Sequence, residues 1–354
     1  MRTTHTPFTA PASGRSRRLA RLVAAGIASI SLLALAGCGD DDPSGQGTAS
    51  PGASSAAATD SASPSPSPAP SVKPSENLDA ITVKGDYGDK PKIKVKAPWA
   101  IKETQSEVLT QGDGAEVLED GNVEVNYTGV NGRTGETFDS SFERGQPVTF
   151  PLDGVIPGFK KGLVGKHVGD RVLIAMTGED GYDSSGGSPQ AGINVGDTLI
   201  FVADITGTTL KSAEGKDVAA KDGLPTVKMS GDKPTVSIPD SDPPAKKTVQ
   251  PLIKGDGAKV GKNDTVTTRS VTVLWKDGKV VDDSWGQRWT PDAQSGETRL
   301  EAMQQAMVGH RVGDRLIMVF PPGTAYKTGD KGQGITKDDT VVMVVDILFT
   351  QQTG

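Results

Sequence analysis

The residue types that usually carry catalysis occur in this chain only as isolated side chains. The histidines, His5, His167 and His310, are far apart, so neither a metal cluster nor a serine–histidine pair can be assembled from them. A Gly-x-Ser-x-Gly nucleophile motif and a phosphate-binding glycine loop are both missing from the sequence. Any reaction must therefore proceed without a nucleophile, a metal or a bound cofactor.

A group of aromatic and aliphatic residues, with one carboxylate among them, remains for chemistry. Its members are Tyr127, Phe138, Asp139, Phe150, Val155, Ile156, Phe159, Tyr182, Ile193 and Phe201. Any single phenylalanine could simply be core, because aromatic rings bury well in half-exposed sheets. Asp139 with the two serines after it could be a turn cap. Tyr182, however, stands in a loop of Gly, Asp and Ser, where periodicity offers no reason for a core residue.

The motifs around these residues resemble those of the FKBP-type peptidyl-prolyl isomerases. The matching segments are Val125–Gly129 (VNYTG), Gly135–Ser141 (GETFDSS), Val155–Phe159 (VIPGF) and Val168–Arg171 (VGDR). They follow the order and spacing of that family over about residues 116–206. One such motif would be a weak signal, but the series is specific.

The resemblance implies an α+β fold, in which an antiparallel β-sheet wraps around one short helix and a pocket lies between them. The residues that it places along the pocket are Tyr127, Phe138, Asp139, Arg144, Val148, Val155, Ile156, Phe159, Tyr182, Ile193 and Phe201. We expect Tyr127, Phe138, Asp139 and Tyr182 to act in catalysis. The others, with Phe150, would bind substrate.

This chain departs from the family at three places in the pocket. Phe159 stands where the family often has tryptophan, and Val148 where an aromatic residue is common, so we expect a smaller floor and a thinner wall. The loop Gly178–Asp183 (GEDGYD) lacks the usual proline and Ala-Tyr-Gly.

The implied reaction is rotation about the bond that precedes proline. Resonance holds a peptide bond planar with a barrier of about 18–20 kcal/mol, and X-Pro bonds exchange isomers over tens of seconds or longer. A catalyst need only bind the twisted amide better than the planar one, and an apolar cleft suits this. A backbone N–H near Ile156 and the Tyr182 hydroxyl would orient the peptide carbonyls. Asp139 would lie near the twisted carbonyl or hold Tyr127 and Arg144 in place.

The chain repeats itself, which predicts two tandem domains. Gly112–Ala115 returns as Gly255–Ala258, and Val168–Arg171 returns as Val312–Arg315. The sequence Thr-Val-Lys at 82–84 also returns at 226–228. We expect domain 1 at residues 80–210, with its core at 116–206, a linker at 211–223 and domain 2 at 224–352. Strands are predicted at 123–127, 171–176 and 198–205, and helices at 157–164 and 299–308.

Domain 2 keeps the repeat but loses much of the pocket. Its substitutions are Ser270 for Tyr127, Val281 for Phe138, Arg299 and Leu300 for Val155 and Ile156, Met303 for Phe159, and Met343 for Phe201. Asp282 and Tyr326 are retained. We therefore expect a folded domain with weak or no activity, in which Trp275, Trp285 and Trp289 are core or form a separate binding surface.

The N-terminus resembles a bacterial lipoprotein signal. A basic cluster precedes the apolar stretch 22–36 and the sequence Leu-Ala-Gly-Cys, so residues 1–37 are predicted to be a signal peptide cut before a lipid-bearing Cys38. The apolar stretch is short for a bilayer span of about 20 residues. Residues 38–79, rich in Ser, Pro and Ala, are predicted to form a disordered stalk. The expected location is the extracytoplasmic face of the bacterial membrane.

The net charge and the predicted lipid anchor limit the classes of partner that we expect. The leader holds five arginines and no acidic residue, so its removal takes the formal net charge from −6 to −11, which disfavours nucleic acid. The favoured function is an isomerase that acts on proline-containing segments of exported proteins. The alternative is a non-catalytic peptide-binding or chaperone lipoprotein, which the changed loop around Tyr182 motivates. A solute-binding lipoprotein would share the tether but not the motifs.

Overall fold

The computed structural model describes residues 72–295 and 297–352. The predicted signal peptide at 1–37, Cys38 and the stalk up to residue 71 lie outside this range. Within the described residues, no helix has the length and apolar character needed to cross a membrane.

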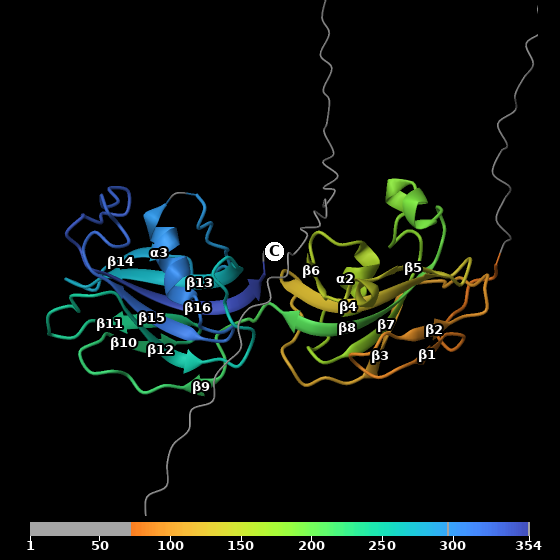
Figure 1. The fold of residues 1–354 in the computed structure, drawn as a ribbon, viewed down its shortest axis with the longest axis horizontal. Helices are drawn as coiled ribbons and strands as arrows, with labels where there is room; N and C mark the ends of the chain where they lie inside the picture. The colour runs from red at the N-terminus through yellow and green to blue at the C-terminus, as the bar shows by residue number, and fades with distance from the viewer. Residues whose placement is uncertain (1–71, 296, 353–354) are drawn as a thin grey trace, which may run out of the picture. The chain divides into compact units, whose positions relative to one another are not determined.

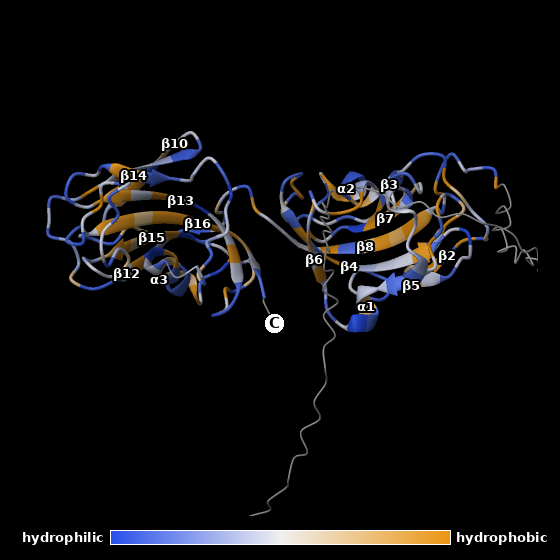
Figure 2. Cartoon of the chain, turned by 90° about the horizontal axis from the view of Figure 1, so that it is seen from above, coloured by the Kyte–Doolittle hydropathy of each residue, from blue (hydrophilic) through white to orange (hydrophobic). Residues whose placement is uncertain are grey.

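Domain 1 is an antiparallel sheet with one main helix packed on one face (Figure 1). Its strands are β3 (Gln105–Thr110), β4 (Asn122–Asn131), β5 (Thr137–Ser140), β6 (Val148–Pro151), β7 (Arg171–Met176) and β8 (Leu199–Thr208). The order is β3-β7-β8-β4-β5, and β6 pairs with the first residues of β4. Hydrophobic residues are concentrated in the central strands, which agrees with the complete burial of β7 (Figure 2). The predicted α+β fold is confirmed.

The main helix, α2 (Pro157–Leu163), approaches β7 closely because two of its residues lack a side chain. A Cβ on Gly158 would lie 2.6 Å from the Cβ of Met176, and one on Gly162 would lie 2.5 Å from the Cδ1 of Ile174. The helix buries Phe159 and Leu163 against the sheet. A shorter helix, α1 (Ser141–Arg144), follows β5, and single 3₁₀ turns lie at Asp183–Ser185 and Pro189–Ala191.

A hairpin covers the opposite face of the domain 1 sheet. It consists of β1 (Thr82–Lys84) and β2 (Lys92–Lys94), which lie below the sheet in Figure 1 while α2 lies above it. The alternating side chains Val83 and Ile93 pack on a second cluster that includes Trp99, Leu173 and Ile200. Each face of the domain 1 sheet is thus covered, one by the helix α2 and the other by the hairpin.

Domain 2 repeats this plan. Its elements are β9 (Lys216–Asp217), β10 (Thr226–Ser230), β11 (Lys233–Ser237), β12 (Thr248–Lys254), β13 (Thr265–Leu274), β14 (Val280–Asp283), α3 (Thr298–Met307), β15 (Arg315–Phe320) and β16 (Val341–Gln351). The sheet order is β14-β13-β16-β15-β12-β9, with the hairpin β10-β11 on the face opposite α3 (Figure 1). The Thr-Val-Lys repeat therefore marks equivalent hairpins in the two domains.

A buried ion pair joins the central strands of domain 1 to its hairpin. Arg171 on β7 contacts Asp204 on β8 through Nε (2.6 Å) and Nη2 (2.8 Å), and both side chains are 1% exposed. The hairpin turn supplies further partners, since Arg171 donates to the carbonyls of Gly85 and Asp89. The backbone N–H of Gly88 donates to Asp204 at 2.7 Å. A buried charge is tolerated only when paired in this way.

Two predicted boundaries need correction. Residues 72–79 were expected in the disordered stalk, but Ser75 pairs with the backbone of Ala100 and Lys102, and Leu78 is 8% exposed in the outer cluster. Burial of Leu78, together with the hydrogen bonds of Ser75, fixes the residues that precede Leu78 against domain 1. The expected linker at 211–223 also contributes β9, which pairs with β12, so part of it belongs to the domain 2 sheet.

Candidate functional site

Most of the predicted site residues of domain 1 meet around one pocket of about 340 Å³, to which five strands and helices and two loops contribute. Tyr127 comes from β4, Phe138 and Asp139 from β5, Phe150 from β6, Phe159 from α2 and Phe201 from β8. Val155 and Ile156 lie in the turn before α2, and Tyr182 in the loop after β7. The pocket is lined by Tyr127, Phe138, Asp139, Phe150, Gly154, Val155, Ile156, Phe159, Tyr182 and Phe201.

Edge-to-face contacts between aromatic rings hold the walls of this pocket. The Phe159 ring lies 4.9 Å from Phe201 at 90°, and Phe138 lies 5.5 Å from Phe201, also at 90°. Tyr127 is tilted against Phe150 and Phe201 at 6.3 and 6.0 Å. Such pairs stabilise by about 0.5–1.5 kcal/mol each beyond the area they bury. Phe159 and Phe201 are buried, whereas Phe138 and Phe150 are half-buried and leave ring surface toward the pocket.

The single carboxylate of the pocket is held by two donors. The Tyr127 hydroxyl donates to Oδ2 of Asp139, and Nη1 of Arg144 donates to Oδ1. Nη2 of Arg144 also donates to the Tyr127 oxygen at 3.0 Å. Burial raises the pKa of Asp139, but the hydrogen bonds from Tyr127 and Arg144 outweigh it, and the pKa falls below the usual value. Burial and the bond to Asp139 raise the pKa of Tyr127 to about 12.

Two donors of the pocket remain available to a substrate. Neither the backbone N–H of Ile156 nor the hydroxyl of Tyr182 has a hydrogen-bond partner within the described part of the chain. Both residues line the pocket and both are half-buried. Burial and the nearby Asp139 carboxylate raise the pKa of Tyr182, so its hydroxyl stays protonated at neutral pH. The pocket thus combines apolar walls with two separate donors.

The loop that carries Tyr182 is anchored by Asp180, a residue that the sequence reading missed. The Asp180 carbonyl accepts the N–H of Gly158 at 2.8 Å, which ties the loop to the first turn of α2. Its carboxylate accepts from Thr104 at 2.5 Å and from Lys161 at 2.7 Å. These contacts hold the loop in place without the family's usual proline.

Gly129 on β4 is a second missed residue, and it sets the position of Phe138. A Cβ at Gly129 would lie 2.6 Å from Cζ of Phe138 and 2.9 Å from Cε1 of Phe201. The ring of Phe138 can therefore lie against β4 only because this position has no side chain. The glycine belongs to the motif VNYTG, so its presence was visible, but its steric role needed the strand register.

Three predicted binding residues do not line the pocket. Arg144 acts through Asp139 and Tyr127, as described above. Val148 is half-buried on β6 and packs against the core. Ile193 is 2% exposed in the same core. Within residues 72–295 and 297–352, no group of three His, Cys, Asp or Glu side chains could hold a metal ion.

In domain 2 the residues at the equivalent positions are packed into the core. Met303 and Met343 are each 1% exposed, and Tyr326 is 8% exposed in the same cluster. The position of Gly129 is taken by Thr272, which pairs with Asp282 as Gly129 pairs with Asp139. Ser270 replaces Tyr127, so Asp282 accepts only a long contact from Ser284 at 3.5 Å. The network of tyrosine, aspartate and arginine is not reproduced there.

Trp289 is half-buried and packs against the same cluster. It pairs with Thr268 on β13 through two backbone bonds of 2.8 and 2.9 Å. The matching residue of domain 1, Val125, pairs with Val148, so Trp289 takes the place of Val148. The Arg299 guanidinium lies 5.9 Å above the Trp289 ring rather than in the pocket floor, which corrects the expected position of this charge. Trp275 and Trp285 are buried in the cluster beneath the hairpin.

Comparison with known proteins agrees with this geometry. Residues 114–205 and 257–348 each match the family described as FKBP-type peptidyl-prolyl cis-trans isomerase. These segments contain the helices α1, α2 and α3, the strands β4 to β7 and β13 to β15, and most of β8 and β16. The chain belongs to the FKBP-type peptidyl-prolyl cis-trans isomerase family.

Individual relatives match one stretch of the chain. A probable FK506-binding protein of Corynebacterium glutamicum is 39% identical over 118 residues, which are 33% of this chain and 97% of the relative. A probable FKBP-type peptidyl-prolyl cis-trans isomerase of Haemophilus influenzae is 36% identical over 131 residues, 36% of this chain and 53% of the relative. This chain therefore spans about half of the latter protein. The crystal structure of FkpA from Escherichia coli is 32% identical, covering 30% of this chain and 47% of that one, with a TM-score of 0.28.

Tyr127→Phe removes one of the bonds that hold the pKa of Asp139 down, so we expect this pKa to rise. The depressed pKa of Asp139 contributes stability that is present at neutral pH and is lost as pH falls through the folded-state value. The variant should therefore begin acid unfolding at a higher pH than the wild type. Carboxyl NMR titration of Asp139 measures the shift directly.

Tyr182→Phe is the matched control, because this hydroxyl makes no hydrogen bond to Asp139. It should leave the Asp139 titration unchanged. An Asp139 pKa that is equal in Tyr127→Phe and wild type would contradict the role of the Tyr127 hydroxyl.

Proposed function

We propose that domain 1 is the active isomerase of this chain and acts on X-Pro bonds of exported polypeptides outside the cytoplasm. The observation that carries the proposal is the contrast between the domains. Domain 1 has a pocket lined by aromatic residues with two unengaged donors, whereas domain 2 has Met303, Met343 and Ser270 at the equivalent positions and lacks the network of tyrosine, aspartate and arginine. Membership of the family indicates the class of reaction, and the contrast between the two domains indicates which of them would catalyse it.

The pocket can favour the twisted amide by two effects. A twisted amide loses resonance and part of its charge separation, so an apolar site disfavours it less than it disfavours the planar form. The proline ring would enter between Phe138, Phe159 and Phe201. The N–H of Ile156 and the hydroxyl of Tyr182 would bind the flanking carbonyls, which fixes the chain on both sides of the rotating bond.

Asp139 would act on this process in one of two ways. As an ionised group near the twisted carbonyl carbon it would stabilise the polarity of the twisted state. As a partner of Tyr127 and Arg144 it would keep the wall of the pocket rigid. Its lowered pKa keeps it ionised at neutral pH in both cases.

Phe138→Ala in the full chain should lower kcat/KM for a proline-containing peptide at least tenfold, which corresponds to about 1.4 kcal/mol of transition-state binding. The matched change Val281→Ala, at the same sheet position in domain 2, should alter kcat/KM by less than twofold. The measurement is peptide isomerisation, with thermal unfolding of both variants alongside.

Equal losses from the two substitutions would contradict the assignment of activity to domain 1. Peptide binding without any acceleration in the wild type would instead favour a non-catalytic peptide-binding or chaperone protein.

The location is a proposal from the N-terminal sequence. Lipid on Cys38 would hold the chain at the membrane, since two acyl chains anchor stably at about 0.8 kcal/mol per buried CH₂. The chain would then meet proline-containing segments as they leave the membrane. The Ser/Pro-rich residues after Cys38 would lift domain 1 clear of the surface.

Cys38→Ser should move the protein from the membrane fraction to the soluble extracytoplasmic fraction of a bacterial host. The peptide isomerase rate of the purified protein should not change, because Cys38 lies outside domain 1. Retention of Cys38→Ser on membranes would contradict the lipid anchor, and Ser44→Ala is a control that should stay membrane-bound.

A further inference from the structure

The loop that carries Tyr182 is closed by the side chain of the next residue, Asp183. This residue begins a single 3₁₀ turn, and its Oδ1 accepts the backbone N–H of Gly196 at 2.7 Å. Its own backbone N–H donates to the carbonyl of Gly178 at 3.0 Å. Asp183 therefore joins the two ends of the loop 178–197 directly beside the tyrosine that lines the pocket.

The carboxylate of Asp183 fits against the backbone of Gly178 only because Gly178 has no side chain. A Cβ at this position would lie 2.4 Å from Oδ1 and 2.6 Å from Oδ2 of Asp183. Any side chain there would therefore displace the carboxylate. The bond to Gly196 thus depends on the residue types at both 178 and 183.

The hydroxyl of Tyr182 is accessible as well as unpaired. In the part of the chain that the structure describes, the side-chain nitrogen and oxygen atoms that are both buried and without a partner belong to Arg269 and Trp289. Tyr182 is not among them, so its oxygen keeps surface that a ligand can reach. A substrate carbonyl can therefore accept from this hydroxyl without any rearrangement of the core.

A second contact anchors the same loop, and domain 2 repeats it. Asp197, whose side chain is 5% exposed, pairs with Arg133 at 2.8 Å. In domain 2, Asp339 pairs in the same way with Lys276 at 2.7 Å. Each of these aspartates also accepts the backbone N–H of the residue three positions earlier, at 2.9 and 2.8 Å. Since both domains have this contact, it belongs to the fold and does not distinguish domain 1.

The bond made by Asp183, in contrast, is specific to domain 1. Tyr326, which the repeat aligns with Tyr182, is followed by Lys327, an exposed residue without a hydrogen bond or ion pair among the described residues. Tyr326 is 8% exposed, and its hydroxyl donates to Gln333 at 3.4 Å. The bond at Asp183 and the unengaged tyrosine hydroxyl therefore occur together in domain 1, and domain 2 has neither.

We propose that Asp183 is a positioning residue, which holds the Tyr182 hydroxyl where it binds a carbonyl of the peptide. Six of the twenty residues at 178–197 are glycines, so this loop has much conformational freedom to lose. A contact that orders it before the substrate arrives removes this cost from binding. The inference rests on the proposed activity of domain 1.

A double-mutant cycle on kcat/KM for a proline-containing peptide tests the proposal in the full chain. Asp183→Ala should lower kcat/KM about fivefold in the wild type but less than twofold in Tyr182→Phe, because the hydroxyl that it positions is then absent. A loss of the same size in both backgrounds would overturn the proposal, since a merely structural role predicts that result. An Asp183→Ala chain with the wild-type rate would also overturn it.

Two further variants test the hydrogen bond itself. Asp183→Asn keeps an oxygen that accepts from Gly196, so it should retain kcat/KM within twofold of the wild type. Gly178→Ala displaces the carboxylate and should reproduce the loss of Asp183→Ala, which keeps the test decisive should the latter unfold. An equal loss in Asp183→Asn and Asp183→Ala, or a wild-type rate in Gly178→Ala, would overturn the proposal. Lys327→Ala is the matched control in domain 2 and should leave the rate unchanged.

Calorimetric binding of the same peptide separates this inference from the proposed function. A wild type that binds the peptide without accelerating its isomerisation contradicts the proposed function. The same cycle on the dissociation constant then tests Asp183, and its loss should again be confined to the chain with Tyr182. A wild type that neither binds nor accelerates the peptide contradicts both.

Discussion

One buried carboxylate in the last strand organises each domain. Asp204 on β8 and Asp346 on β16 are almost completely inaccessible to solvent, so each must be paired with an arginine on the neighbouring strand. Removing one partner of such a pair typically costs about 3–5 kcal/mol. In domain 1 the turn of the hairpin completes the pair with backbone carbonyls and an N–H. This requirement fixes the hairpin to the outer face and leaves the opposite face to the helix and the pocket.

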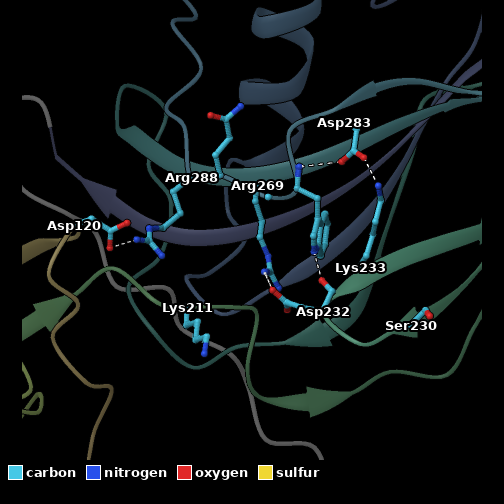
Figure 3. A pocket seen from close by; sticks show the side chains of 11 residues that line it. Asp120, Lys211, Ser230, Asp232, Lys233, Arg269, Asp283 and Arg288 are labelled. Carbon is cyan, nitrogen blue, oxygen red and sulfur yellow. Dashed lines mark hydrogen bonds and ion pairs between the residues drawn. The ribbon is translucent and has the colours of Figure 1, made fainter.

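The two domains use this scaffold differently because a few residues near its centre differ. In domain 1, Gly129 allows the Phe138 ring to lie against β4, and Tyr127 holds Asp139 with Arg144. In domain 2, Thr272 and Ser270 take the two positions on β13, and Met303, Met343 and Trp289 pack in or against the core there. On the outer face, Arg269 of domain 2, which pairs with Asp232 (Figure 3), stands where domain 1 has Asn126.

Much of the fold could be predicted from the sequence, because its motifs are specific and its central strands are continuous apolar runs. The strand at 171–176 was predicted with its observed bounds, and the helices at 157–164 and 299–308 within one residue at each end. The hairpin of domain 1 was not recognised as structure, because β1 and β2 are three residues long with one half-buried side chain each. Residues 72–79 looked disordered by composition, whereas the burial of Leu78 and the backbone hydrogen bonds of Ser75 show an ordered segment.

The site was predicted to a similar degree, and for related reasons. Residues within the motifs, such as Phe138 and Phe159, could be carried over by position. Contacts that depend on strand register could not, which is why the steric role of Gly129 and the replacement of Val148 by Trp289 were missed. Asp180 was also missed, because its bonds to Thr104 and Lys161 join segments far apart in the sequence.

The central claim is that the open pocket of domain 1 carries the isomerase activity of the whole chain. Two separate substitutions, at Gly129 of domain 1 and at the equivalent Thr272 of domain 2, test it most directly. Gly129→Thr places a side chain where the Phe138 ring lies, and Thr272→Gly removes the equivalent side chain from domain 2. The account predicts that Gly129→Thr lowers the peptide isomerisation rate of the full chain at least tenfold, while Thr272→Gly leaves it within twofold of the wild type. A Gly129→Thr chain that folds and retains the wild-type rate would contradict it.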